Sequence, residues 1–374
     1  MRKVFILYEN FYTPDGQRMS IGGIQTYIKM LAEVIKNLNM TIVIFQYSNV
    51  NFKKLYNCIE VYGVAMKTTW SKRKKNQVLF NKCLEQYDSQ KDIIIFASET
   101  MSVRNKERRV IGIQHGITWD VRRREHFSHQ KNLLFIFFSA IKAYITAKRL
   151  SNLKLLVAVD YNFVNWYRTQ VAYIETDIKI IPNCTKINYD IKKRTDIIKI
   201  IFARRFYQYR GTKLFAPVAK RIVNKFENVR ITFAGSGPDE LYLKEMFRDN
   251  PQINFITYDS QKSLDIHTEY HIAVVPSIGS EGTSLSLLEA MASKCAVIAT
   301  NVGGMTNIIL DNYNGLLVNL DEKELYEAVE KLIIDEKIRE RLAENAFKTV
   351  SQAFNEELWK KRWIDVINYI ITEK

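Results

Sequence analysis

The sequence predicts an α/β protein with two domains, each built around a parallel β-sheet. The chain has 374 residues, more than a single hydrophobic core usually serves. Short runs rich in Ile, Val and Phe alternate with longer amphipathic segments, which is the pattern of strand and helix units in a parallel sheet. This series stops near residue 184 and then begins again, which indicates a second sheet.

The elements follow in chain order. In the first half, the apolar runs predict strands at residues 4–7, 41–46, 93–97, 110–114 and 155–159, and a helix at 26–37. In the second half they predict strands at residues 197–203, 229–234, 253–256, 272–275, 296–300 and 315–318. The last helix, 356–372, carries Trp359 and Trp363 at helical spacing and therefore needs a surface to pack on.

The join between the two halves is expected at Ile181–Cys184, because Pro and Asn end a strand there and a charged stretch follows. We therefore expect an N-terminal domain at residues 1–184 and a C-terminal domain at residues 185–355. The helix at 356–374 is expected to pack back on the N-terminal domain.

The positive charge is concentrated in one half. The net charge is +15, and residues 1–184 contain 28 Lys and Arg against 14 Asp and Glu, which accounts for +14. An excess of positive charge in one half indicates that this half has an anionic partner. An anionic membrane surface, a phosphorylated acceptor or nucleic acid could each fit. Trp70 followed by the four cations of residues 72–75, with further cations at 104–109 and 122–124, favours an anionic leaflet, although basic loops without a partner remain open.

Targeting and metal signals are weak. Residues 1–8 are typical of a buried strand and not of a signal peptide. The apolar stretch 132–147 includes Lys142 and is too short to span a bilayer; it is either an interfacial segment or a buried helix. The four cysteines are widely spaced, without a CxxC pair or a nearby His cluster. We expect a cytoplasmic protein, peripheral on the inner face of the cell membrane, without a disulfide framework or zinc.

The segment after strand 272–275 predicts an anion site. Gly282 lets the backbone approach a ligand, and the amides of Thr283, Ser284 and Leu285 open a helix whose dipole favours a phosphate. Glu281 and Glu289 flank this helix start, and a carboxylate suits the vicinal hydroxyls of a ribose or a sugar. Two glutamates at this spacing also occur on ordinary helix surfaces, so the surrounding sequence has to decide.

That surrounding sequence resembles the C-terminal signature of family 4 retaining glycosyltransferases. The resemblance lies in the pairs Pro276-Ser277, Glu281-Gly282 and Gly303-Gly304 and in the segments 287–292, 297–300 and 314–318. It implies the GT-B architecture, in which two Rossmann-like domains face each other across a cleft. Residues 1–184 would then bind the acceptor, and residues 185–355 would bind the nucleotide sugar. It also implies that Glu281 meets the donor sugar and Glu289 the nucleotide ribose. Departures from the usual pattern at Thr283, Ser286, Lys294, Ala296 and Asn307 leave the donor sugar open.

A second cluster of cations follows strand 197–203. Fixed positive charges at the end of a strand can neutralise a departing diphosphate without a metal. The resemblance assigns this role to Arg205 and Arg210, with Lys213 as a further candidate; an Arg-rich solvated turn is the alternative. It also places Gly235 close to the nucleotide base, although turn glycines alone are a weak signal.

The N-terminal half contributes three further candidates. Gly22 and Gly23 precede the helix at 26–37, and the resemblance places such a loop across the cleft at the donor phosphates, although plain helix entry explains it equally well. His115 follows a strand, where the family carries its active-site His that contacts the sugar or stabilises the transition state. Asp120 is a weaker candidate for orienting this His.

Together these features predict a retaining hexosyltransferase of cell-surface polysaccharide synthesis. The donor would be a nucleotide diphosphate sugar, the acceptor a glycan or a lipid-linked precursor, and neither a cofactor nor a metal is expected. A nucleotide-sugar hydrolase or epimerase of the same architecture is the nearest alternative. A basic nucleic-acid-binding protein is a more distant one, because the sequence contains no known readout module.

Overall fold

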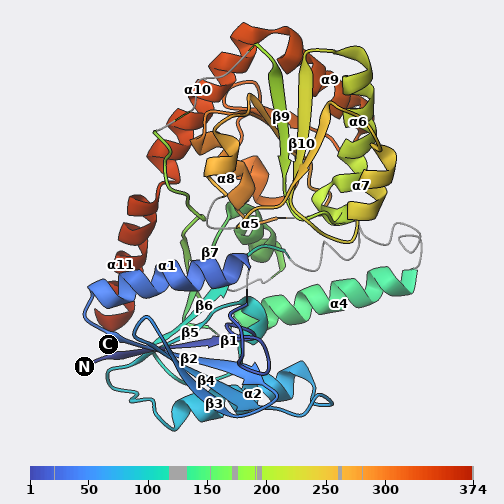
Figure 1. The fold of residues 1–374 in the computed structure, drawn as a ribbon. Helices are drawn as coiled ribbons and strands as arrows, with labels where there is room; N and C mark the ends of the chain where they lie inside the picture. Colours follow the sequence, from blue (N-terminus) through green and yellow to red (C-terminus); the bar gives the residue numbers. More distant parts are fainter. Residues whose placement is uncertain are drawn as a thin grey trace.

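The computed structural model describes residues 1–20, 22–117, 133–151, 153–170, 176–189, 191, 196–259, 263–279 and 281–372. Its two α/β domains lie one above the other in Figure 1, each with a central sheet. This confirms the predicted GT-B fold class.

The N-terminal sheet has the strand order β3-β4-β2-β1-β5-β6-β7-β8 and is parallel except for the antiparallel pair β3 and β4. The strands are β1 Lys3–Tyr8, β2 Thr41–Ser48, β3 Phe52–Tyr56, β4 Ile59–Ala65, β5 Ile93–Phe96, β6 Val110–Gln114, β7 Leu155–Ala158 and β8 Asp177–Ile180. The helices are α1 Gly23–Asn37, α2 Lys72–Leu84, α4 Leu133–Leu150 and α5 Tyr161–Gln170, with the short helix η1 Glu99–Met101.

The C-terminal sheet is parallel, with the order β11-β10-β9-β12-β13-β14. The strands are β9 Ile198–Ala203, β10 Val229–Ala234, β11 Ile253–Ile256, β12 Ile272–Val275, β13 Ala296–Thr300 and β14 Leu316–Val318. The helices are α6 Thr212–Lys225, α7 Glu240–Met246, α8 Leu285–Ala292, α9 Glu322–Ile334 and α10 Glu336–Ala353, with the short helices η3 Gln208–Arg210, η5 Asp265–His267 and η6 Gly303–Asn307. All six predicted strands of this half are present, with their bounds within one residue.

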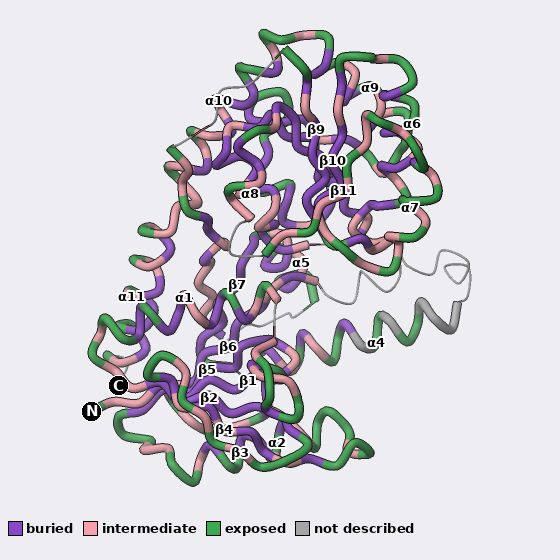
Figure 2. Tube along the Cα trace, viewed as in Figure 1, coloured by how far each residue is buried: buried purple, intermediate pink, exposed green. Residues whose placement is uncertain are grey.

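Each sheet is covered on both faces, and the buried residues follow the strands (Figure 2). In the N-terminal domain α1 covers one face, while α2, α4 and α5 cover the other. In the C-terminal domain α6, α7 and α9 cover one face, and α8 and α10 the other. Strands buried on both faces are continuously apolar, which is why the central strands could be recognised from the sequence.

The last helix, α11 (Glu356–Thr372), returns to the N-terminal domain. Trp359 and Trp363 belong to the core beneath α1, and Trp363 Nε1 donates a hydrogen bond to the Tyr27 hydroxyl at 3.0 Å. The Tyr27 and Trp359 rings meet edge to face at 5.1 Å. The chain crosses between the domains beside Thr185, whose N–H donates to the Phe354 carbonyl at 3.0 Å. The chain therefore passes between the domains twice, once near Thr185 and once near Phe354.

The domains also touch through loops at the ends of their strands. The N–H of Asn162, at the start of α5, donates to Asn307 Oδ1 in η6 at 3.2 Å. A side chain cannot be added at Gly116, because its Cβ would lie 2.8 Å from the Gly282 nitrogen. The loops after β6 and β7 of one sheet therefore meet the loop after β12 of the other, and this junction positions the site.

Candidate active site

The loop after β12 leads directly into α8, at the carboxyl edge of the C-terminal sheet. Ser284 is the N-cap residue of α8, and its side chain makes no capping hydrogen bond. We predicted a helix start at Thr283, but the helix begins at Leu285. The first amides of α8 are therefore those of Leu285, Ser286 and Leu287, and free amides at a helix start attract an anion.

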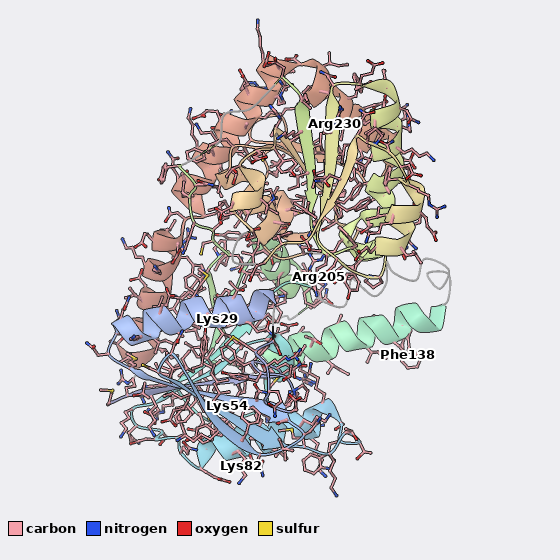
Figure 3. All side chains as sticks on the ribbon, viewed as in Figure 1. Lys29, Lys54, Lys82, Phe138, Arg205 and Arg230 are labelled. Atoms are coloured by element: carbon pink, nitrogen blue, oxygen red, sulfur yellow. The ribbon has the colours of Figure 1, made fainter. Side chains whose placement is uncertain are left out.

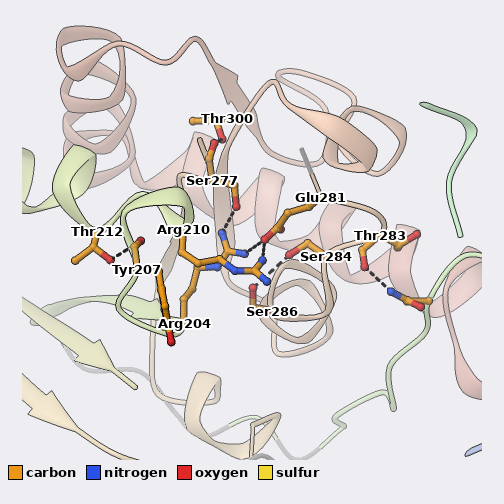
Figure 4. A network of polar contacts seen from close by, with 11 residues as sticks. Arg204, Tyr207, Arg210, Thr212, Ser277, Glu281, Thr283, Ser284, Ser286 and Thr300 are labelled. Atoms are coloured by element: carbon orange, nitrogen blue, oxygen red, sulfur yellow. Dashed lines mark hydrogen bonds and ion pairs between the residues drawn. The ribbon is translucent and has the colours of Figure 1, made fainter. Parts of the chain in front are cut away.

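Glu281 precedes this helix and forms ion pairs with two arginines. Its Oε1 forms ion pairs with Arg204 and with Arg210, and Arg204 also donates to the Ser277 hydroxyl (Figure 4). The side chains of Glu281 and Arg204 are 9% and 3% exposed, whereas that of Arg210 is 27% exposed. The second carboxylate oxygen of Glu281 is buried without a hydrogen-bond partner. One carboxylate thus faces two guanidinium groups, which leaves an excess of one positive charge.

The neighbouring arginine that pairs with Glu281 is Arg204, whereas Arg205, which we predicted to neutralise the diphosphate, makes no ion pair with Glu281. The N–H of Arg204 donates to the Ala234 carbonyl at 2.9 Å, and the N–H of Phe206 donates to the Ser236 carbonyl at 2.8 Å. Arg205 lies between these two bonded residues and is exposed, with its guanidinium 5.5 Å from the centre of the Tyr207 ring. Burial lowers the pKa of Arg204 to about 10 and also lowers that of Arg210, and both remain charged at neutral pH.

Two glycines fix the backbone around this cluster. Gly211, which follows Arg210, has a φ of +86°, and a Cβ there would overlap the Pro276 carbonyl. Gly235 has a φ of +145°, and a Cβ there would overlap the Arg204 carbonyl. Both glycines are required by close backbone contact and by left-handed conformation. We predicted that Gly235 lies near a nucleotide base; the structure shows that the fold itself requires glycine at this position.

Glu289 lies further along α8 and is half-buried. Its Oε1 accepts a hydrogen bond from the Ser263 hydroxyl at 2.7 Å. Burial raises the pKa of Glu289 to about 7, against the opposing effect of this hydrogen bond. The neighbouring Tyr258 has its pKa raised to about 12, by burial and then by the charge of Glu289, so the two side chains share one environment. Glu289 is therefore a half-buried carboxyl group whose pKa lies close to physiological pH.

We expect Glu289→Gln to stabilise the protein at alkaline pH. Because the pKa of Glu289 is raised on folding, its contribution to stability is present below its unfolded pKa and is lost as the pH rises towards 7. Gln mimics the protonated form, so the variant should unfold at nearly the wild-type temperature at pH 5 and at a higher temperature at pH 8. One pKa unit corresponds to about 1.4 kcal/mol, which limits the gain to about 3 kcal/mol. Thermal unfolding at both pH values measures it.

The exposed Glu340 on α10 offers a matched control. Glu340→Gln removes the same charge from the same domain, and we expect no pH-dependent gain from it. An equal gain in both variants would mean that overall charge, and not the burial of Glu289, determines the stability.

The N-terminal domain brings its glycine loop to the start of α8. Gly22 is the N-cap of α1, and a Cβ on Gly23 would lie 3.9 Å from the Leu285 side chain. Residues more than 260 positions apart in the sequence are therefore neighbours across the domain junction. The glycine loop therefore lies beside the start of α8.

His115 lies at the end of β6, half-buried, with its Nε2 2.9 Å from the Ala97 carbonyl. Since a carbonyl only accepts, Nε2 carries the proton and Nδ1 is left as an acceptor. Burial lowers the pKa of His115 to about 4, so the ring is neutral at physiological pH. The Tyr27 ring meets it edge to face at 5.0 Å. The His115 carbonyl oxygen would lie 2.8 Å from a Cβ on Gly282, which places this residue beside the loop of Glu281.

Three other predicted residues are placed differently or are not described. The Thr283 hydroxyl donates to the Val159 carbonyl, and its own carbonyl accepts from Asn183 Nδ2 at 2.7 Å, so Thr283 joins the domains. Lys213 lies 3.9 Å from Asp239 and half-exposed, and its ammonium is 5.7 Å from the Tyr242 ring centre. Asp120 lies outside the described residues, as do Arg122–Arg124.

Asp160 was missed by the sequence analysis. It precedes α5, and its Oδ1 accepts from the Phe163 N–H at 2.8 Å, as a helix cap does. Its Oδ2 is buried without a partner and would lie 3.3 Å from a Cβ on Gly282. Burial raises the pKa of Asp160 to about 6. An acidic residue before a helix signals only a cap, so the sequence could not show that it faces the loop of Glu281.

Comparisons with known proteins relate this chain to glycosyltransferases. Residues 185–349 match the family "Glycosyl transferases group 1". An uncharacterized glycosyltransferase of Methanocaldococcus jannaschii is 25% identical over 395 residues, covering 96% of each chain. The capsular polysaccharide biosynthesis glycosyltransferase CapM of Staphylococcus aureus is 28% identical over 176 residues, covering 46% of each. Anabaena HepE, solved in complex with UDP and glucose, has the same fold with a TM-score of 0.71 at 15% identity, covering 98% of this chain and 100% of HepE.

The fold and these relatives together identify a glycosyltransferase of GT-B architecture. The part that matches the glycosyl transferases group 1 family contains the Arg204, Arg210 and Glu281 cluster and the start of α8.

Proposed function

We propose that the protein is a retaining hexosyltransferase that uses a nucleotide diphosphate sugar as its donor. Its acceptor is a glycan or a lipid-linked precursor of a cell-surface polysaccharide, used at the inner face of the cell membrane. One observation carries the donor assignment: two arginines and one carboxylate are gathered at the start of α8, beside its uncapped amides. Such a site suits a pyrophosphate with a sugar attached.

The diphosphate lies, in this proposal, between the guanidinium groups of Arg204 and Arg210 and the first amides of α8. Gly22 and Gly23 close the site from the other domain. Glu289 accepts hydrogen bonds from the ribose hydroxyls, replacing the one it now accepts from Ser263. The unpartnered oxygen of Glu281 accepts from a hydroxyl of the donor sugar. Each part of the donor thus meets a group of matching chemistry.

In the transfer step, negative charge develops on the leaving diphosphate. The bond between sugar C1 and the β-phosphate oxygen breaks, and the new bond from C1 to the acceptor oxygen forms on the same face. The acceptor hydroxyl proton passes to the leaving phosphate oxygen. Arg204, Arg210 and the α8 dipole stabilise the negative charge that grows on the diphosphate, which is the task that a metal ion performs elsewhere. Neutral His115 accepts a hydrogen bond from a sugar hydroxyl through Nδ1.

One relative and one solved structure support the proposed pathway and donor. CapM is named for capsular polysaccharide biosynthesis, and the HepE structure contains UDP and glucose. The basic N-terminal half supports an acceptor at an anionic surface, since net charge of this size draws a protein towards anionic lipids.

A nucleotide-sugar screen by thermal shift tests the proposal. We expect one nucleotide diphosphate sugar to raise the unfolding temperature without added metal, because a ligand at 100 times its Kd stabilises by about 2.7 kcal/mol. The anomer of the product then decides between retention and inversion. Free sugar released without acceptor would indicate a hydrolase, and a changed sugar still attached to its nucleotide would indicate an epimerase. Stabilisation by DNA or RNA alone would identify a nucleic-acid-binding protein.

A further inference from the structure

Helix α4 presents an apolar face that nothing in the described structure covers. Along this 18-residue helix five large apolar side chains are between 39% and 64% exposed: Phe137, Phe138, Ile141, Tyr144 and Ile145. At about 100° per residue they fall within an arc of about 120° on one side of the helix. The opposite side holds the buried Ala143, Ala147 and Leu150. The helix is therefore anchored by one face and offers the other to a partner.

The helix extends away from the body of the N-terminal domain in Figure 1, and Phe138 lies on this projecting part in Figure 3. Its C-terminal end packs against the sheet, in the same apolar cluster as α2. No helix in the described part of the chain is long and apolar enough to cross a membrane. The exposed face thus belongs to a helix that can lie along a surface.

Exposed cations lie on α4 itself and on two segments that belong to the same side of the N-terminal sheet. Lys148 follows the apolar residues on the same side of α4 and is exposed. Helix α4 contacts η1, and the segment after η1 exposes Arg104, Lys106 and Arg108. Helix α2, which covers the same face of the sheet, exposes Lys72, Arg73 and Lys74 at its start. An apolar stripe with cations beside it is the composition of a helix that lies in the interface of an anionic bilayer.

We propose that α4 is the element by which the enzyme docks on an anionic membrane, with Phe137, Phe138, Ile141, Tyr144 and Ile145 among the lipid headgroups. This inference rests on the proposed use of an acceptor at the membrane. A second copy of the chain is a poorer occupant, because the N-terminal half carries a net charge of +14 and two such faces would repel each other.

The test is co-sedimentation of the full-length protein with phosphatidylcholine vesicles containing about 30% phosphatidylglycerol. We expect the wild type to bind these vesicles, to bind pure phosphatidylcholine weakly, and to be released by salt. Phe138→Asp should weaken binding at least tenfold. The matched control is Leu241→Asp on α7, because Leu241 is 68% exposed in the other domain, and it should bind like the wild type. Arg104→Gln combined with Arg108→Gln should weaken binding to the anionic vesicles only.

Nucleotide binding separates this inference from the proposed function. All variants should keep the wild-type thermal shift with the donor, since α4 does not form the donor site. Vesicle binding by Phe138→Asp equal to that of the wild type would overturn the docking role of α4. So would a lipid-free dimer that Phe138→Asp dissociates, which would make a second copy the occupant. Vesicle binding through α4 without any response to nucleotide sugars would support docking and reject the proposed function.

Discussion

Arg204→Gln is expected to lower the kcat/KM of sugar transfer by about 10²- to 10³-fold, the size of effect seen when one preorganised donor to a developing charge is removed. Arg204 is buried and holds both Glu281 and Ser277, so its loss removes a fixed charge from the proposed diphosphate site. The steady-state rate with the donor found in the screen measures this effect. Arg204→Lys should recover part of the rate, because it restores the charge without the planar fork.

The adjacent arginine is the matched control. Arg205→Gln removes the same charge one residue away, from a side chain that is exposed over Tyr207. We expect a change of less than about threefold, typical of an exposed charge. A loss of activity confined to the Arg205 variant would restore our original assignment and show that the Arg204 interactions serve only the fold.

This pair also shows where the sequence stopped being informative. The pattern of strand, cations and helix pointed to this segment, and Arg210, which we named from the sequence, pairs with Glu281. Two neighbouring arginines are alike in residue type, however, and the residue types alone do not show which of them pairs with Glu281. The same limit applies to Thr283, whose contact with Val159 depends on how the domains meet.

The strands show a similar division. The C-terminal strands are short, continuous apolar runs, because they are buried on both faces, and all were predicted. The three strands that we missed in the N-terminal sheet are β3, β4 and β8. Strands β3 and β8 lie at its two edges, and β3 carries two lysines, while β4 alternates apolar and polar residues. Edge strands are partly solvated, so they lack the apolar run that identifies a central strand.

Asp160 shows a further limit. Its type and position identify a helix cap, and the structure confirms the capping hydrogen bond. Its second oxygen faces a loop of the other domain only because Gly282 and Gly304 have no side chains. Contacts of this kind depend on how the loops at the strand ends of the two domains meet, and no local sequence pattern shows this.

Glu281→Gln is expected to separate nucleotide binding from transfer. In the free enzyme Glu281 is the one described carboxylate that pairs with Arg204 and Arg210. The neutral amide leaves both guanidinium groups without a counter-charge, and removing one partner of a buried ion pair costs about 3 kcal/mol or more of stability. We therefore expect a lower unfolding temperature without nucleotide. The same unpaired charges should bind a nucleoside diphosphate about three to ten times more tightly, since the diphosphate supplies the missing anion.

Transfer should nevertheless fall at least about 100-fold, because the amide cannot accept the sugar hydroxyls as a carboxylate does while charge develops on the diphosphate. Thermal shift with UDP, GDP and ADP measures binding, and product formation measures transfer. Glu240→Gln is the control, since Glu240 pairs with Lys244 on the surface at 2.8 Å and such a pair contributes about 1 kcal/mol at most. If Glu281→Gln weakens nucleotide binding as strongly as it weakens transfer, Glu281 positions the arginines for the diphosphate and does not compete with it for their charge.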